Sequence, residues 1–243
     1  MRSISKFLIG LTAAAGLFLP ATAQETEVPA ISFKTNIYNE YGAENKFHFI
    51  IGSTNGSEYY DVDMGFGNNE VEVGYATVVD GAWEGTVVKC RVSAEGVVNI
   101  YGDPTKIDVF IAEGCYITEI DLSRCVNLDV VNLEHNELKS LDLSPNTKLR
   151  AIYLSDNPGT EASPLKIGTP KPNLQILEAD IIDHFDPQFK PEYPNLVSLD
   201  LYHNMSVKSL DLSGCPKLVN LVVEFTGVEK LDLTPVPNLW HLN

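Results

Sequence analysis

Cysteine, basic residues and long apolar runs are all scarce in this sequence of 243 residues. The four cysteines include no CxxC pair, which argues against a zinc ribbon or a thioredoxin-type redox site. Seventeen lysines and arginines stand against 33 aspartates and glutamates, giving a formal net charge of −16. Because such a surface repels phosphate groups, nucleic acids and anionic lipid headgroups are disfavoured as partners.

The one long apolar run lies at the N-terminus and has the features of a secretory signal peptide. Two basic residues precede an apolar stretch from Phe7 to Leu19, and Ala21-Thr22-Ala23 provides the small residues of a cleavage site. The stretch is shorter than the roughly 20 residues that a membrane-spanning helix needs. The sequence therefore predicts a signal peptide over residues 1–23, export to the periplasm, cell surface or extracellular space, and no transmembrane span.

Export would permit disulfide bonds. Cys90 and Cys115 lie in or near the same N-terminal region, and the sequence leaves open whether they pair. Cys125 and Cys215 occupy equivalent positions of a repeat, which favours a structural role as small buried side chains.

From residue 117 onward the chain repeats a leucine pattern every 10 or 11 residues. The segments 117–125, 128–136, 138–146 and 149–157 fit L-x-x-L-x-L-x-x-N/C, and the pattern returns from Leu196 to the end. One coil cannot bury its own leucines, but each neighbour covers them, and each buried leucine contributes roughly 1.5 to 3 kcal/mol. The Asn or Cys at the ninth position is expected to turn inward and to satisfy backbone groups at the bend.

Two kinds of unit alternate, so the full period is two units long. One kind carries Asp-Leu-Ser/Thr, and the other is variable between its apolar positions. An L-x-L alternation indicates a strand, and two short strands per coil leave no room for a helix. The sequence predicts a mainly β fold over residues 113–243: a curved leucine-rich-repeat solenoid with strands on both faces, a parallel sheet on the concave face, and few or no helices.

Residues 155–195 depart from this spacing and are rich in proline. Leu165-Lys166-Ile167 and Leu177-Glu178-Ala179 are expected to keep their strands in register. Between Asp183 and Asn195, one strand of the convex face is expected to be replaced by a loop.

Residues 24–112 have a different pattern, with seven short β-rich runs separated by Gly, Asn, Asp and Pro. This spacing is typical of a β-sandwich domain. We expect the domain to cap the open end of the solenoid and to join it rigidly through residues 103–117. The runs lie at 31–38, 46–51, 59–66, 70–79, 86–92, 97–101 and 107–111.

With these residues in view, the chain resembles the bacterial secreted and surface leucine-rich-repeat proteins, internalin-like in a broad sense, with nested half-repeats. The Leu-Asp-Leu-Ser and Leu-x-x-Asn units carry the resemblance, over about half of the chain. The segment from Val62 to Gly67 is also similar to the D-x-G-D-G turn of PKD-type β-sandwich modules, although Phe66 stands where that turn has its second Asp. The resemblance implies binding of proteins or glycans at the cell envelope and no shared enzymatic activity.

The residues between and just after the apolar positions of the variable units are expected to face the concave surface. They form an acidic patch with aromatic islands, a composition suited to contacts with a protein or a sugar. A solvated sheet face without a ligand is the alternative interpretation. The candidate partner-binding residues are Asn132, Glu134, His135, Tyr153, Glu178, Asp180, Asp200, Tyr202, His203, Glu224 and Phe225.

Signals for metal binding and catalysis are weak. His135 and His203 are predicted to lie three coils apart, at about 4.8 Å per coil, which is too far for one coordination sphere. A ladder of Asp121, Asp142, Asp211 and Asp232 lacks the glycine-rich signature of calcium-binding β-rolls, so hydrogen bonding to neighbouring turns is expected instead. With no catalytic motif in the sequence, we expect no enzyme, no catalytic residue, no metal and no cofactor.

Two functions stay open. The leading hypothesis is a non-catalytic exported interaction protein of the bacterial envelope that binds a protein partner through the concave face. The alternative is a glycan-binding module that uses the concave face or the aromatics Tyr59, Tyr60, Tyr75 and Trp83, which are more often core or rim residues of a sandwich. The segment 239–243 begins a new strand without a polar cap, so homo-association through this coil is a further expectation.

Overall fold

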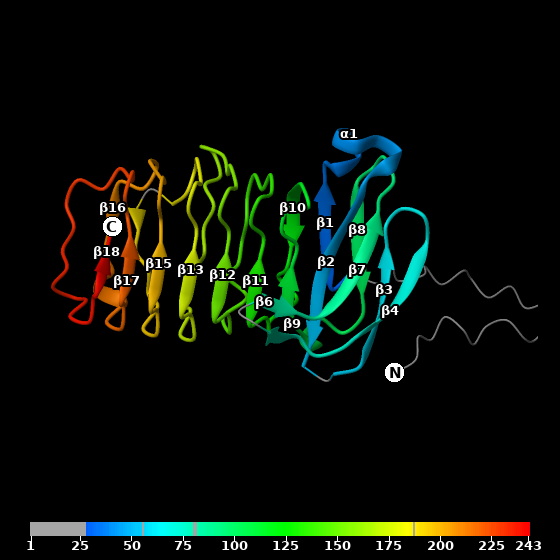
Figure 1. Cartoon of the computed structure of the whole chain (residues 1–243), viewed down its shortest axis with the longest axis horizontal. Coiled ribbons are helices and arrows are strands. Elements are labelled where there is room, and N and C mark those ends of the chain that lie inside the picture. Colours follow the sequence, from blue (N-terminus) through cyan, green and yellow to red (C-terminus); the bar gives the residue numbers. More distant parts are fainter. Residues whose placement is uncertain (1–27, 55, 80–81, 187) are drawn as a thin grey trace, which may run out of the picture.

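The computed structural model describes residues 28–243 except 55, 80–81 and 187, so the expected signal peptide lies outside the described residues. The chain forms an elongated stack of strands (Figure 1). Within the described residues, helical structure is confined to four short segments, which confirms the prediction of a mainly β solenoid with few helices. These segments are α1 Ile37–Tyr41, η2 Gly42–Glu44, η3 Pro104–Lys106 and η4 Leu212–Gly214.

A nine-stranded sheet runs along one side of the molecule, with the strands of successive coils side by side and parallel (Figure 1). The repeat strands of three residues each place one inward-facing residue between two outward-facing ones. The parallel strands are β9 Ile107–Ile111, β11 Val130–Asn132, β12 Ala151–Tyr153, β13 Ile176–Glu178, β15 Ser198–Asp200, β17 Asn220–Val222 and β18 His241–Leu242. The sheet ends in the antiparallel strands β2 Lys46–Ser53 and β7 Thr86–Arg91.

The opposite side of the coils carries shorter strand contacts. Asp142 pairs with Lys166 and Leu165 with Phe185, so the segments expected to stay in register through the proline-rich stretch do so. The expectation of a loop between Asp183 and Asn195 was wrong. There β14 Gln188–Phe189 pairs in parallel with β16 Ser209–Leu210, and the buried Phe189 replaces the leucine of the usual pattern.

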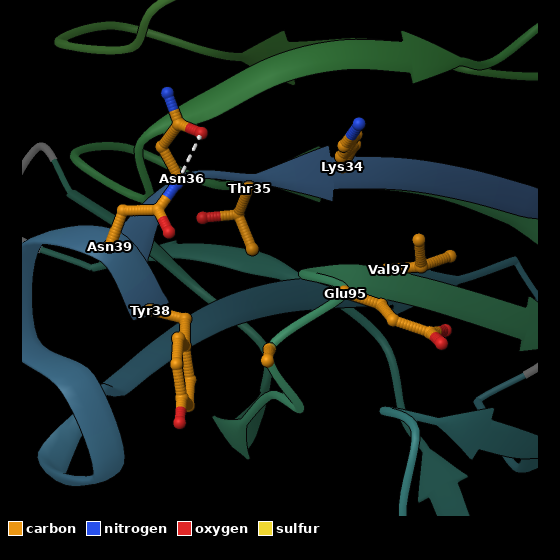
Figure 2. Close-up of a pocket in the computed structure, with 8 residues that line it drawn as sticks. Lys34, Thr35, Asn36, Tyr38, Asn39, Glu95 and Val97 are labelled. Carbon is orange, nitrogen blue, oxygen red and sulfur yellow. Dashed lines mark hydrogen bonds between the residues drawn. The ribbon is translucent and has the colours of Figure 1, made fainter.

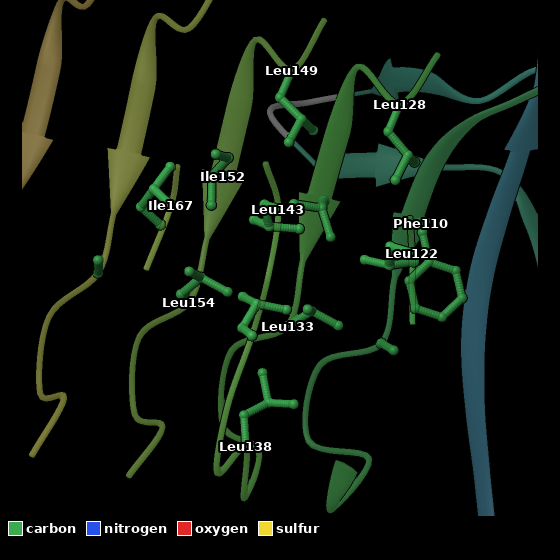
Figure 3. Close-up of a cluster of buried hydrophobic side chains, with 14 of the residues drawn as sticks. Phe110, Leu122, Leu128, Leu133, Leu138, Leu143, Leu149, Ile152, Leu154 and Ile167 are labelled. Atoms are coloured by element: carbon green, nitrogen blue, oxygen red, sulfur yellow. The ribbon is translucent and has the colours of Figure 1, made fainter. Parts of the chain in front are cut away.

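The repeat leucines fill the interior between the two sides of each coil (Figure 3). Leu133, Leu143 and Leu154 are fully buried, as are Leu201 and Leu212 of later coils, whereas Leu233 near the C-terminus is 37% exposed. Asparagines close the bends. Asn136 donates from Nδ2 to the carbonyls of Ala112, Leu133 and Glu134, and its Oδ1 accepts from two further backbone amides. The expected inward turn of the ninth residue is thereby confirmed.

The N-terminal part places a second sheet against β2, β7 and β9. Its strand order is β10–β1–β8–β3–β4, with β10 Ile117–Asp121, β1 Ile31–Thr35, β8 Val97–Tyr101, β3 Glu58–Asp63 and β4 Asn68–Val73. Phe33 lies between the two sheets, with its ring centroid 5.8 Å from that of Phe49 and 6.2 Å from that of Phe110. Each of the seven predicted β-rich runs contains a strand.

Both sheets continue across the expected domain boundary at residue 112, which falls in the turn between β9 and β10. On one side β9 pairs with β11 of the next coil, and on the other β10 pairs with β1. One buried apolar cluster also extends from the N-terminal part through the repeats. The division into domains over 24–112 and 113–243 stays a prediction.

All four cysteines are buried and their thiols are free. Cys125 and Cys215 are fully buried and donate from Sγ to the carbonyls of Ala30 and Pro191, 3.4 and 3.7 Å away. Their expected role as small buried side chains at equivalent bends is confirmed.

Candidate functional site

The outward side chains of β11, β12, β13, β15 and β17, with the second and third residues after each strand, form a surface that we call the sheet face. It is the surface that the sequence places on the concave side. Strand pairing aligns Asn132, Tyr153, Glu178, Asp200 and Val222 in one row. Backbone hydrogen bonds between successive coils align a second row, Glu134, Ser155, Asp180, Tyr202 and Glu224. Neighbours within a row are about 4.8 Å apart, so all eleven candidate residues lie on or beside one continuous surface.

The residue after each member of the second row has a positive φ, between 53° and 59°. This left-handed conformation turns the chain sharply from the sheet toward the buried asparagines that close the bends, which stack from coil to coil as an asparagine ladder. It also brings the side chain to the rim of the sheet face. The rim residues are His135, Asp156, Ile181, His203 and Phe225.

The end of the sheet face nearest the N-terminus is covered. There the outward side chains of Val109, Val130 and Ala151 are buried, and Ala76 packs against them. Ala76 immediately precedes a hairpin formed by β5 Thr77–Val79 and β6 Ala82–Glu84, which lies beside this end of the sheet in Figure 1. The sequence reasoning missed this cover. The sequence signal of this cover is one outward strand position. It is apolar in the first coils and polar in later ones, where Ser198 and Asn220 occupy it.

Carboxylates concentrate on the uncovered part. Partial burial raises the pKa of Glu178, and the nearby Glu134, Asp200 and Asp180 raise it further. Partial burial also raises the pKa of Asp200 despite a hydrogen bond of 2.8 Å that its Oδ1 accepts from the amide of Tyr202. Four carboxyl groups therefore share a surface on which a cationic group would stabilise their ionised forms.

Glu134 and His135 place a carboxylate and an imidazole at one edge of the same surface. Desolvation raises the pKa of Glu134, although Asn132 donates from Nδ2 to its carboxylate at 3.0 Å. The Nδ1 of His135 lies 3.0 Å from Oδ2 of Asp156 in the next coil, and this hydrogen bond raises the imidazole pKa. Ser155 also donates a hydrogen bond to Asp180. Side chains of adjacent coils therefore hold one another in place.

Three rings gather at the other end of the sheet face. The centroids of Tyr202 and Phe225 are 5.6 Å apart with the rings nearly perpendicular, and His203 lies 5.9 Å from Tyr202 and 6.0 Å from Phe225. Phe225 is 56 % exposed, and His203 is exposed as well. His203 is thus grouped with aromatic rings, in a coil three steps away from that of His135.

The aspartate ladder on the opposite side of the coils has a local role. Asp121, Asp142, Asp211 and Asp232 each accept a hydrogen bond from the amide two residues later, at 2.8 to 3.0 Å. This confirms the expected hydrogen bonding to turns. No group of three metal-binding side chains gathers in the part of the chain that the structure describes.

The aromatics proposed for glycan binding differ in exposure. Tyr60 is buried and donates from its hydroxyl to the carbonyl of Asp103, at 3.0 Å, so it is a core residue. Tyr59 and Tyr75 are exposed. The side chain of Trp83 lies outside the described part of the structure.

A separate open pocket of about 560 Å³ lies between β1, α1 and the turn before β8. Its polar groups are largely engaged within the fold. Thr35 donates to the carbonyl of Cys115 at 2.6 Å, and Asn36 donates from Nδ2 to Glu137 at 2.7 Å. Figure 2 shows the amides of Asn36 and Asn39 facing each other, while the ring of Tyr38 points away from both. The pocket is lined only by residues of the N-terminal part, and it contains none of the candidate residues.

Comparisons with known proteins find likenesses among solved structures. No family model matches the chain, and neither does any curated protein. The functional domain of InlJ from Listeria monocytogenes, which includes a cysteine ladder, is similar to this chain at 20% sequence identity and a TM-score of 0.43. The match covers 58% of this chain and 36% of that domain. A likeness at this level leaves partner and activity open.

Within the described residues, no helix has the length and apolar character needed to cross a bilayer.

Proposed function

We propose that the protein is a non-catalytic, exported interaction protein of the bacterial envelope that binds a protein partner through the sheet face. The observation that carries the proposal is the uncovered part of this face. It presents carboxylates and exposed rings on a backbone fixed by inter-coil hydrogen bonds. A surface of this kind is preorganised, so binding a partner costs little ordering entropy.

The composition of the face favours a protein over other ligands. Tyr153, Tyr202 and Phe225 provide large contact areas with few rotatable bonds. The carboxylates around them give polar contacts at the edges, the distribution found at many protein interfaces. The net charge of −16 disfavours a nucleic acid.

Site-specific photocrosslinking tests this proposal. A benzoylphenylalanine residue is incorporated in place of Tyr153 in the full-length protein and, separately, in place of the exposed Lys139 away from the sheet face. Irradiation of the producing cells should give a discrete protein adduct from position 153 alone. Adducts from position 139 alone would show that another surface binds.

Charge reversal then tests the adduct partner after its identification and purification. Glu134→Lys combined with Glu224→Lys should abolish its binding to the exported chain. Unchanged affinity would move the site elsewhere. Retention of the chain on a polysaccharide, without any protein adduct, would support the glycan-binding alternative instead.

A further inference from the structure

The chemistry of the expected partner can be inferred from how rings and carboxylates alternate on the sheet face. This inference rests on the proposed function. Tyr202 lies between Asp180 and Glu224 in its row, because Ile181 donates its amide hydrogen to the carbonyl of Tyr202 and His203 donates to that of Glu224. The half-buried Tyr202 ring is therefore flanked by a carboxylate from each adjacent coil.

Two more carboxylates lie in the neighbouring row of the sheet face, which contains Glu178 and Asp200. Asp200 is the last residue of β15, two residues before Tyr202. In the preceding coil, Glu178 of β13 pairs with Asp200. The pKa of each is raised by burial and by neighbouring carboxylates. Together these groups concentrate negative potential next to exposed π faces.

Permanent cations are missing from these strands. The segments 130–135, 151–156, 176–181, 198–203 and 220–225 contain no lysine or arginine. Ion pairs elsewhere in the described chain use such residues: Arg150 pairs with Asp129 just before β12, and Lys190 lies 3.0 Å from Asp211 on the opposite side of the coils. The carboxylates of the sheet face have no comparable lysine or arginine neighbour within their own strands.

We propose that the C-terminal half of the sheet face binds an arginine-containing basic segment of the partner protein. A guanidinium group would stack on the exposed Phe225 ring beside Tyr202 while its N–H groups bond to Asp180, Asp200 or Glu224. Arginine suits this surface better than lysine, since its planar group stacks on a ring and still donates sideways to carboxylates. Ala76 packs against the other end of the face, which leaves the later coils for this docking.

Fluorescence anisotropy with defined peptides tests the proposal on the full exported chain. The probes are labelled dodecapeptides in which glycine alternates with arginine, with lysine or with glutamate. The arginine peptide should bind most tightly, the lysine peptide more weakly, and the glutamate peptide not at all. Binding should weaken as the salt concentration rises.

Two triple variants with the same change in net charge separate local recognition from the overall field. Asp180→Asn, Asp200→Asn and Glu224→Gln together should weaken arginine-peptide binding by at least about tenfold, since three charge-assisted hydrogen bonds lose their charge. Glu161→Gln, Glu192→Gln and Glu229→Gln, at exposed sites off the sheet face, should change it by less than about twofold. Equal losses in the two triple variants would overturn the proposal.

The rings are tested by Phe225→Asn, because Asn tolerates the positive φ of 56° at this position. This variant should lose more affinity for the arginine peptide than for the lysine peptide, whereas Tyr59→Ala in the N-terminal part should leave both unchanged. An unchanged arginine preference in Phe225→Asn would overturn the stacking arrangement.

The two proposals can fail separately. A crosslinked protein partner that binds the sheet face but is not displaced by the arginine peptide would overturn this inference and leave the proposed function standing. Absence of any adduct from the sheet face would remove the proposed function itself.

Discussion

Lys171 donates a hydrogen bond from its ammonium group to the backbone carbonyl of Leu143, 2.8 Å away, in the interior of the solenoid. Its side chain is fully buried. In the preceding coil the equivalent bend holds Asn146, whose Nδ2 donates to the carbonyls of Leu122 and Cys125. A lysine therefore performs at this bend the task that an asparagine performs one coil earlier.

The first prediction follows from the burial of this charge. Burial lowers the pKa of Lys171 from its usual 10.5 to about 8, with Asp142 acting in the opposite direction. Between pH 8 and 10.5 the unfolded chain then binds more protons than the folded one, so this residue makes the free energy of unfolding rise with pH. Below pH 8 both states are protonated, and the folded state carries the full cost of the buried charge.

We expect Lys171→Met to be more stable than the natural protein at pH 7, with an advantage that shrinks between pH 8 and 10. Urea denaturation at several pH values measures the difference. The comparison must be made between the two proteins, because burial raises the pKa values of Cys90, Cys115 and Cys125 to about 12 and destabilises both proteins above pH 9. A difference independent of pH would contradict the prediction.

The second prediction concerns the asparagine ladder. Asn136→Ala should lower the free energy of unfolding by about 3 kcal/mol, since it leaves buried backbone groups at one bend without partners. Asn238→Ala, which removes only an exposed hydrogen bond to the carbonyl of Pro216, serves as the control and should cost less than about 0.5 kcal/mol. Chemical denaturation monitored by circular dichroism measures both, and equal losses would argue against a structural ladder.

The third prediction compares equivalent leucines. Leu212→Asp should unfold the array, because Leu212 is 1% exposed and a carboxylate there would have no partner in the leucine interior. Leu233→Asp, at the matching position one coil later with 37% exposure, should leave the fold intact. Thermal melting followed by circular dichroism distinguishes them, and a near-normal Tm for Leu212→Asp would contradict the solenoid.

The fourth prediction is a stabilising change. Ile181 has a φ of 53° while its branched side chain is 45% exposed. A left-handed conformation of a β-branched residue costs roughly 1 kcal/mol, and Asn accepts it more readily. Ile181→Asn should therefore raise the Tm in scanning calorimetry. Val197→Asn, an exposed apolar residue outside the positive-φ set, should not, and a lowered Tm in Ile181→Asn would show that its side chain contributes more by packing.

Much of the solenoid could be predicted because its pattern is local and repeated. The alternation around Leu177 and Leu199 fixes which side chains turn inward, and stacking forces equivalent residues into rows. The rows in turn place Glu178 beside Asp200 and Tyr202 beside Glu224, so the candidate site could be assembled from spacing alone.

The departures arise where a contact is not local or where an unusual residue replaces a usual one. The cover over Val130 and Ala151 includes Ala76, which is far away in the sequence, and no repeat period reveals such a contact. Phe189 continues the opposite side of the coils although prolines surround it, because an aromatic ring fills a leucine position. Lys171 was missed because a buried lysine is rare and the pattern specifies only Asn or Cys at its bend.

The shared strand β9 has a consequence for the order in which the chain folds. Ribosomal synthesis makes the N-terminal strands first, and β9 pairs with β2 on one edge while its other edge accepts β11. The completed N-terminal part thus offers a ready template, and each later coil can add to it over a short loop without waiting for distant partners. Assembly would then begin at the N-terminal part and add one coil at a time, so that the unpaired edge of the sheet moves toward the C-terminus.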